Sequence, residues 1–393
     1  MRDLTQLAFK QETTPGTAIA VAAADVLVRI REGDSPNFEV DPVETQEVQA
    51  YSSSRPVRPG KRLFRGSASW VLRPGSAPDT VAPSCGPLLV NGLLKQEQLK
   101  QIAIGSITNP PYRDGDEIEG VTSGAKGIVF RDHSVGPLKY YATTGTMISG
   151  EVIRKTGGGS VPQATSSGSP TNKGFLYHLV DSDFTGGSDS KHHGTVRMIR
   201  GSGANGYFVE GRGVLGELAF EFKNNEHAIA RASMVGPISA FGDVATFDLA
   251  SYPDDGIVEP RFVAASLTLG GYAPTDLVDL NLSIPLNLEV REDANDTSDN
   301  GLRFCDYDRR GNPPLLTIEP AMVSAATYDF FTKYKDGTTF AATWKLGSNF
   351  EFFADECQIV SAGFGSRRNL ATVPLQLRLC GKKNNELYLW QHA

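Results

Sequence analysis

Polar and apolar residues alternate along much of the chain. In FRGSASWVLR, residues 64–73, the aromatic and aliphatic side chains fall on one face, and the arginines and serines fall on the other. This two-residue period is typical of a β-strand that is buried on one side only. Further segments alternate in the same way or are rich in β-favouring residues, and turn-forming Gly, Pro, Asn or Asp bound each of them. They are residues 25–31, 61–73, 195–200, 214–222, 262–270, 279–289, 339–346 and 371–379.

Only two stretches have a helical pattern. They are residues 78–96, which two internal prolines weaken, and residues 320–336, with Pro320 near the first turn. The pattern therefore predicts an antiparallel all-β protein with two accessory helices.

The order of the expected elements suggests domains. A strand, a polar loop, a second strand and a helix occur twice, which predicts an internal repeat with two tandem lobes, each containing a helix. The segments DGDEIEG (114–120) and ISGEVIR (148–154) echo each other, which predicts a small inserted β-domain. The Gly/Ser/Pro/Thr-rich stretch that follows predicts a linker. The expected boundaries are 1–110 and 174–240 for the first lobe, 111–158 for the insert, 159–173 for the linker and 241–393 for the second lobe.

Composition narrows the class of protein. The 393 residues carry a net charge of −7, which argues against tight binding of nucleic acid, because Lys and Arg dominate binding to phosphates. The four cysteines are far apart in sequence and predict reduced thiols rather than a disulfide framework. No signal or membrane segment is expected, so we expect synthesis in the cytoplasm and no membrane partner.

The sequence lacks recognisable catalytic motifs. No G-x-S-x-G, H-E-x-x-H or P-loop occurs, and His192 and His193 have no third ligand at a metal-site spacing. We therefore expect no enzyme activity, no metal and no cofactor. A hydrolase with scattered carboxylates remains an alternative, because glycosidase acids leave little local signature.

Two blocks of charge surround a loop much longer than an ordinary hairpin turn. One chain that carries both blocks can satisfy them by head-to-tail contact with copies of itself, although a solvated hairpin is the alternative. For the same reason Arg65 and Arg73 are expected to meet carboxylates of a neighbouring subunit. The acidic block is Glu32, Asp34, Glu39, Asp41, Glu44 and Glu47, and the basic block includes Arg55, Arg58, Lys61 and Arg62.

Several segments, taken in order, resemble the major tail tube proteins of long-tailed (siphovirus-type) bacteriophages. The resemblance is carried by ETTPGTAIA (12–20), RPGKRLFRGSASWVLRP (58–74), MIRGSGANGYFVEGRGVLGELAFEFKNN (198–225) and the stretch 285–320. No single motif is diagnostic, and the evidence is their order over most of the chain outside 112–173.

The resemblance implies a structural virion protein. Its β-sandwich lobes would form rings that stack into the hollow tail tube, through which DNA passes transiently and without specific binding. A chain with two lobes would form a trimer with pseudo-sixfold symmetry, and a hexamer is the alternative. The long loop would contact the next ring, the insert would decorate the outside, and the terminator, distal tail and tape measure proteins would be partners.

An acidic lumen would let DNA pass without binding it, because like charges repel. Glu217, Glu221 and Glu226 are the expected lumen residues. The main alternative function is a carbohydrate- or receptor-binding tail-tip or decoration protein. Sugar platforms need exposed aromatic side chains, and the chain has three tryptophans.

Overall fold

The computed structural model describes residues 4–30, 36–43, 58–157, 161–179, 192–202, 205–247, 256–292, 301–307, 312–381 and 386–393. This part of the chain consists mostly of β-strands in large antiparallel sheets, so the expected all-β fold class is confirmed.

The N-terminal sheet has the strand order β2-β1-β12-β13-β14-β4-β3. Its strands are β1 (Leu4–Gln11), β2 (Val26–Arg29), β3 (Pro36–Val43), β4 (Arg58–Val71), β12 (Gly194–Ser202), β13 (Asn205–Lys223) and β14 (Ile229–Val244).

The C-terminal sheet continues from β13 in the order β16-β19-β24-β21-β20-β15. Its strands are β15 (Thr268–Leu269), β16 (Asp279–Ile284), β19 (Leu315–Ile318), β20 (Thr339–Leu346), β21 (Phe350–Ala362) and β24 (Leu375–Cys380). Two separate hairpins are formed by β17 (Leu288–Glu292) with β18 (Leu302–Tyr307), and by β22 (Gly365–Arg367) with β23 (Leu370–Thr372).

A third group of strands leads from the C-terminal sheet to a small domain. Strand β25 (Tyr388–Gln391) lies between β21 and β11 (Thr171–Leu179), and β11 pairs with β5 (Leu94–Ile102). The small domain, residues 103–166, contains β6 (Glu117–Gly120), β7 (Lys126–Val129), β8 (Leu138–Thr144), β9 (Val152–Lys155) and β10 (Gln163–Thr165). The two echoing segments pair with each other, since β6 is antiparallel to β9.

Strand β13 joins the two large sheets. Its first half pairs with β12, its second half pairs with β16, and β14 runs along its other edge throughout. The alternation predicted for this strand accounts for the arrangement, because Leu218, Phe220 and Phe222 all face the core. There Phe222 meets Phe352 edge-on at 5.0 Å between ring centroids. Such aromatic pairs add roughly 0.5–1.5 kcal/mol each beyond the area they bury.

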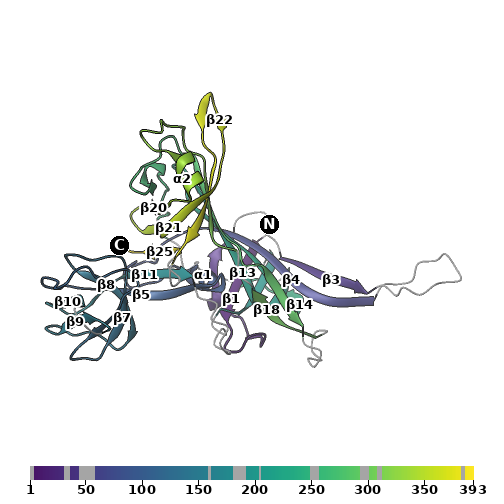
Figure 1. Cartoon of the computed structure of the whole chain (residues 1–393). Coiled ribbons are helices and arrows are strands. Elements are labelled where there is room, and N and C mark those ends of the chain that lie inside the picture. Colours follow the sequence, from purple (N-terminus) through teal and green to yellow (C-terminus); the bar gives the residue numbers. More distant parts are fainter. Residues whose placement is uncertain are drawn as a thin grey trace.

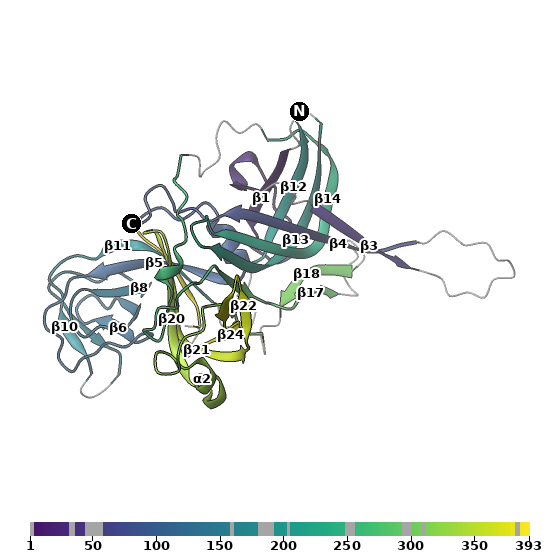
Figure 2. The ribbon, with the colours of Figure 1, turned by 90° about the horizontal axis from the view of Figure 1, so that it is seen from above.

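The three parts point in different directions (Figures 1 and 2). The small domain lies at one end, and the hairpin of β3 and β4 projects from the opposite end in both views. The sheet with β20, β21 and the helix α2 (Phe330–Asp336) extends to one side. The β4–β14 ladder stops at Leu63↔Pro237, and beyond that point β4 continues alongside β3 alone among the described strands. We call this hairpin, residues 36–43 and 58–66, the arm.

The helices are much shorter than the sequence predicted. Instead of 78–96, α1 covers only Gly86–Asn91, because Leu93 adopts a left-handed φ of 61° and Leu94 already begins β5. Instead of 320–336, α2 covers Phe330–Asp336, where Asp329 caps the start and Gly337, at φ 64°, ends the helix. Two single-turn 3₁₀ helices lie at Ala23–Asp25 and Ala264–Ser266, the second inside the segment 262–270 predicted as a strand.

Two expected boundaries differ from the structure. The predicted linker 159–173 contains β10 and the first residues of β11, so the expectation of irregular chain is wrong there; Ala164 of β10 packs in the core of the small domain. The expected division between lobes at residue 240 falls inside β14, and one continuous hydrophobic core includes residues from both sides of it. The small domain has a separate core, with Tyr112, Ile118 and Tyr140 among its members.

Candidate assembly surfaces

Only part of the predicted acidic block lies within the described structure. Glu39 and Asp41 belong to β3, whereas Glu32, Asp34, Glu44 and Glu47 lie outside the described residues. The register sets β3 against the basic block of β4, with Val40 opposite Arg62 and Val43 opposite Arg58. The arm therefore brings backbone positions of both blocks together in one hairpin.

The basic block lies at the start of β4. Arg58 is the first residue of that strand, and Arg55 lies outside the described residues. Lys61 is half-buried and forms an ion pair with Glu292 of β17, while the side chain of Arg62 is exposed. The Lys61–Glu292 pair connects the base of the arm to the β17–β18 hairpin. An exposed pair of this kind contributes at most about 1 kcal/mol.

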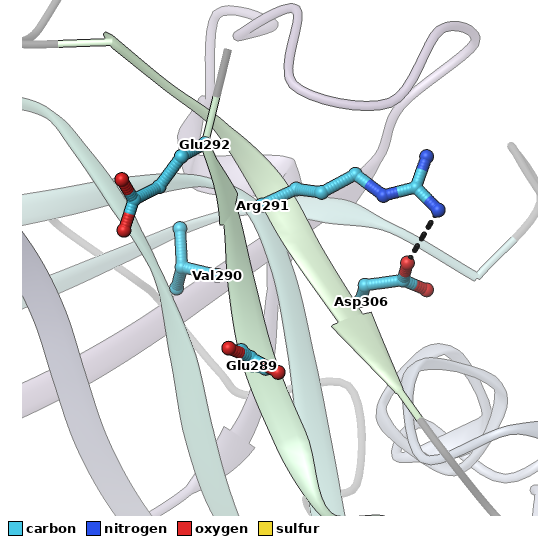
Figure 3. A pocket seen from close by; sticks show the side chains of 5 residues that line it. All are labelled: Glu289, Val290, Arg291, Glu292 and Asp306. Atoms are coloured by element: carbon cyan, nitrogen blue, oxygen red, sulfur yellow. Dashed lines mark ion pairs between the residues drawn. The ribbon is translucent and has the colours of Figure 1, made fainter.

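A shallow groove beside this contact is lined by Glu289, Val290, Arg291, Glu292 and Asp306 (Figure 3). Arg291 reaches across the hairpin to Asp306, with 2.8 Å between Nη2 and Oδ2, and its guanidinium lies 5.5 Å from the Phe304 ring. Glu292 points to the other side of β17 in Figure 3. The groove is mixed in charge, with three carboxylates and one cation among its lining residues.

Arg73 has a partner within its own chain. Its guanidinium pairs with Glu259, and only 14% of the arginine side chain is exposed. The expectation that Arg73 meets a carboxylate of another subunit is therefore wrong for this residue. Arg65 is exposed on the same face of β4.

The outward face of the shared sheet is polar and made largely of small residues. Ser69, Arg231, Ala219 and Ser283 lie in one row across β4, β14, β13 and β16. A shallow recess opens on this face, lined by Ala219, Phe220, Glu221, Arg231, Asn281, Leu282, Ser283 and Thr317.

The predicted lumen residues do not form one acidic patch. The Oε1 atom of Glu217 accepts hydrogen bonds from the backbone N–H groups of Leu286 at 3.0 Å and Asn287 at 3.1 Å, so this carboxylate holds the turn between β16 and β17. Glu221 pairs with Lys223 and Arg231, at 2.8 Å and 3.4 Å.

The third residue, Glu226, is exposed in the turn between β13 and β14. The positively charged side chains of Lys223 and Arg231 offset the negative charge of Glu221. The described part of this face is therefore polar rather than strongly acidic.

Sequence reasoning missed a buried carboxylate in the segment ETTPG. Glu12 is 2% exposed, and its oxygens accept hydrogen bonds from the Gly16 N–H, the Thr195 hydroxyl and the Gly213 N–H at 2.7–2.9 Å. Burial raises the pKa of Glu12, although these hydrogen bonds oppose the rise. The only sequence signal is an acid beside a tight Pro-Gly turn, and it does not identify partners on β12 and β13.

His192 and His193 are buried, not held in solvent as polar loop residues would be. His193 Nε2 lies 2.7 Å from the carbonyl of Cys305, and His192 Nδ1 lies 3.1 Å from the carbonyl of Val90. Within the described residues no group of three or more His, Cys, Asp or Glu side chains is arranged to hold a metal ion. The helices found there are too short and too polar to cross a membrane.

The sequence of this chain matches no protein-family model, and no curated protein matches it.

Proposed function

We propose that this chain is the tail tube protein of a long-tailed bacteriophage, a non-enzymatic structural protein of the virion. Copies would form rings, and the rings would stack into a tube that conducts DNA during ejection. We propose a trimer whose two β-sandwich lobes per chain give pseudo-sixfold symmetry. The terminator, distal tail and tape measure proteins would be further partners.

The main support for this proposal is the arm. It projects from the sheet that contains the later part of β4, and its two strands are drawn from segments of opposite charge. Beyond β14, the arm strand β4 pairs with β3 alone among the described strands, so the surface of another copy could pack against the arm there. A second copy of the chain carries both an acidic and a basic block, so each block of the arm can contact the block of opposite charge on the next copy. When this head-to-tail contact repeats, it gives a ring or a filament.

The polar outward face of the shared sheet supports the same proposal. Its recess is lined by small and polar residues, by Phe220 and Leu282, and by the Arg231–Glu221 ion pair. Charges that are paired with each other offer little attraction to phosphates, which is what a channel that must release DNA requires. We propose this face as the part of each copy that faces the lumen.

The carbohydrate-binding alternative has less support. All three tryptophans are buried, with Trp70 at 1%, Trp344 at 0% and Trp390 at 7% exposure. None of them offers the exposed platform on which a sugar ring stacks.

Negative-stain electron microscopy of the purified chain over a concentration series tests the proposal. Rings or hollow tubes are expected. A monodisperse particle of one chain at every concentration would contradict the proposal, and binding of that particle to a glycan array would support the alternative.

A further inference from the structure

Two cations on the outward face of the shared sheet hold one carboxylate between them. Glu221 of β13 pairs with Lys223 of the same strand, with 2.8 Å between Oε1 and Nζ. It also pairs with Arg231 of β14, with 3.4 Å between Oε2 and Nη2. The acid is the least exposed of the three side chains, at 25% against 45% for Lys223 and 60% for Arg231. A polyanion that approaches from solvent therefore meets the two cations first.

Glu221 is the main counter-charge of both cations. The pKa of Lys223 is raised first by the hydrogen bond and the charge of Glu221, and less by the charges of Glu226 and Asp279. Arg231 forms an ion pair with Glu221 and with no other described residue. Loss of the Glu221 charge would therefore leave Arg231 without a carboxylate partner and Lys223 with weaker ones.

No other side chain of the recess on this face can replace Glu221, because the rest of its lining, apart from Arg231, is uncharged. These lining residues are Ala219, Phe220, Asn281, Leu282, Ser283 and Thr317. Their hydroxyl and amide groups can donate hydrogen bonds to phosphate oxygens, as such groups do in many protein–DNA contacts. A phosphate that reached a freed Arg231 would thus find further donors beside it.

A third cation lies in the same row of the sheet as Arg231. Across β14, β13, β16, β19 and β24 the row consists of Arg231, Ala219, Ser283, Leu315 and Arg378. Residues directly opposite each other share a face of a sheet, so Arg231 and Arg378 face the same side, about 19 Å apart. Arg378 is exposed and forms no ion pair with a described residue.

We propose that Glu221 prevents nucleic acid from binding to this face, because it neutralises Arg231 and Lys223 and leaves Arg378 as the one cation of its row without a carboxylate. A single cation holds a phosphate weakly, whereas several cations on one face contact several phosphates of one strand. The inference rests on the proposed function only in assigning this face to the lumen, since DNA binding can be measured whether or not the chain forms tubes.

Fluorescence anisotropy with a short labelled DNA duplex of mixed sequence, at about 50 to 200 mM salt, tests the role of Glu221. The wild type should bind weakly and with little dependence on salt. Glu221→Gln removes the charge and keeps the size of the side chain. It should bind about tenfold more tightly at the lowest salt, and the plot of log K against log[salt] should steepen by about 1 for each cation freed.

Two further variants separate a local effect from a change in net charge. Glu221→Gln combined with Lys223→Gln and Arg231→Gln should bind as weakly as the wild type, because the freed cations are then absent. Asp336→Asn changes the net charge by the same amount as Glu221→Gln, but at an exposed site on α2, and should behave like the wild type.

The proposal is overturned if Glu221→Gln binds DNA no better than the wild type, or if Asp336→Asn gains as much affinity. A wild type that already binds with a steep salt dependence would overturn it whatever the variants do. If Glu221→Gln does not fold, Glu221→Thr places a small, neutral, strand-favouring side chain at the same position and gives the same test.

Electron microscopy of the same samples keeps this result separate from the proposed function. Tubes of wild-type protein without a gain in affinity for Glu221→Gln would overturn only the role of Glu221. The gain in affinity without wild-type tubes would support the role of Glu221 and contradict the tube.

Discussion

The Glu12 carboxylate accepts a hydrogen bond from the backbone N–H of Gly213 at 2.8 Å, although 201 residues separate the two in sequence. The same side chain holds the Gly16 N–H and the Thr195 hydroxyl. One buried acid thus fixes the Pro-Gly turn after β1 against both β12 and β13.

Glu12→Gln should lower the free energy of unfolding by about 1–3 kcal/mol, because the amide nitrogen cannot accept a hydrogen bond and leaves a buried donor unpaired. Glu226→Gln is the matched control, since Glu226 is exposed. Urea denaturation compares the two. Equal stability of both variants would show that the Glu12 contacts do not hold the turn.

Gly16 tests the same turn in another way. It has a φ of +77°, and a Cβ there would lie 2.3 Å from the carbonyl oxygen of Arg303. Gly271 has a similar φ of +85° but no atom within 4 Å of its would-be Cβ. Gly271→Ala should therefore cost only the left-handed strain of about 1–2 kcal/mol. Gly16→Ala should cost about 1–3 kcal/mol more, because the β18 backbone must move.

The two alanine variants are to be compared by thermal and urea denaturation. Similar losses of stability in both would mean that the β18 backbone yields without cost, which contradicts the close packing of the turn.

Glu151 should make the small domain sensitive to acid. It is 2% exposed, and it accepts hydrogen bonds from the N–H groups of Ile148 and Ser123 at 2.6 Å and 3.0 Å. Burial alone would raise the pKa of Glu151, but these hydrogen bonds outweigh burial and lower it below 4.5. A carboxyl with a depressed pKa in the folded state stabilises the fold above its ordinary pKa, and this contribution is lost as the pH falls.

At pH 7, Glu151→Gln should destabilise the small domain by about 1–3 kcal/mol, because the amide leaves donors unpaired. The difference from the wild type should shrink below pH 4.5. Hydrogen exchange in β6 and β9 reports on this domain. Glu117→Gln, at an exposed position of β6, should change little. A difference that stays constant with pH would contradict the role given to the ionised carboxylate.

Charge reversal on the arm tests the proposed assembly. With Arg58, Lys61 and Arg62 all changed to Glu, the chain should remain folded by circular dichroism but form no rings or tubes, since the arm would then repel an acidic partner surface. Glu292→Gln is the control, because it removes the internal Lys61–Glu292 pair without changing the arm. Tubes formed normally by the triple variant would refute the role of the basic block.

The sequence predicted strands well where alternation was flanked by turn residues. The segment 339–346 is β20 itself, because Gly337 and Gly347 both adopt positive φ at its two ends. Helix prediction failed at 78–96, because α1 ends at Asn91 and only Gly92 and the left-handed Leu93 separate it from Leu94, where β5 begins.

Contacts between distant residues were outside the reach of sequence patterns. Arg73 and Glu259 are 186 positions apart, so nothing local to Arg73 indicated a partner in its own chain. For the arm, by contrast, the separated charge blocks were visible in the sequence, because they are contiguous along the chain.

The sharing of β13 between two sheets has a mechanical consequence. The C-terminal sheet is hydrogen-bonded to β13 through β16, β13 to β14, and β14 to β4, which continues into the arm. A torque applied to the C-terminal sheet therefore reaches the arm along a ladder of backbone hydrogen bonds without crossing a loop. To bend the C-terminal sheet relative to the N-terminal sheet, the single 19-residue strand β13 would have to slide against its neighbouring strands. The two sheets should therefore move under load as one rigid unit.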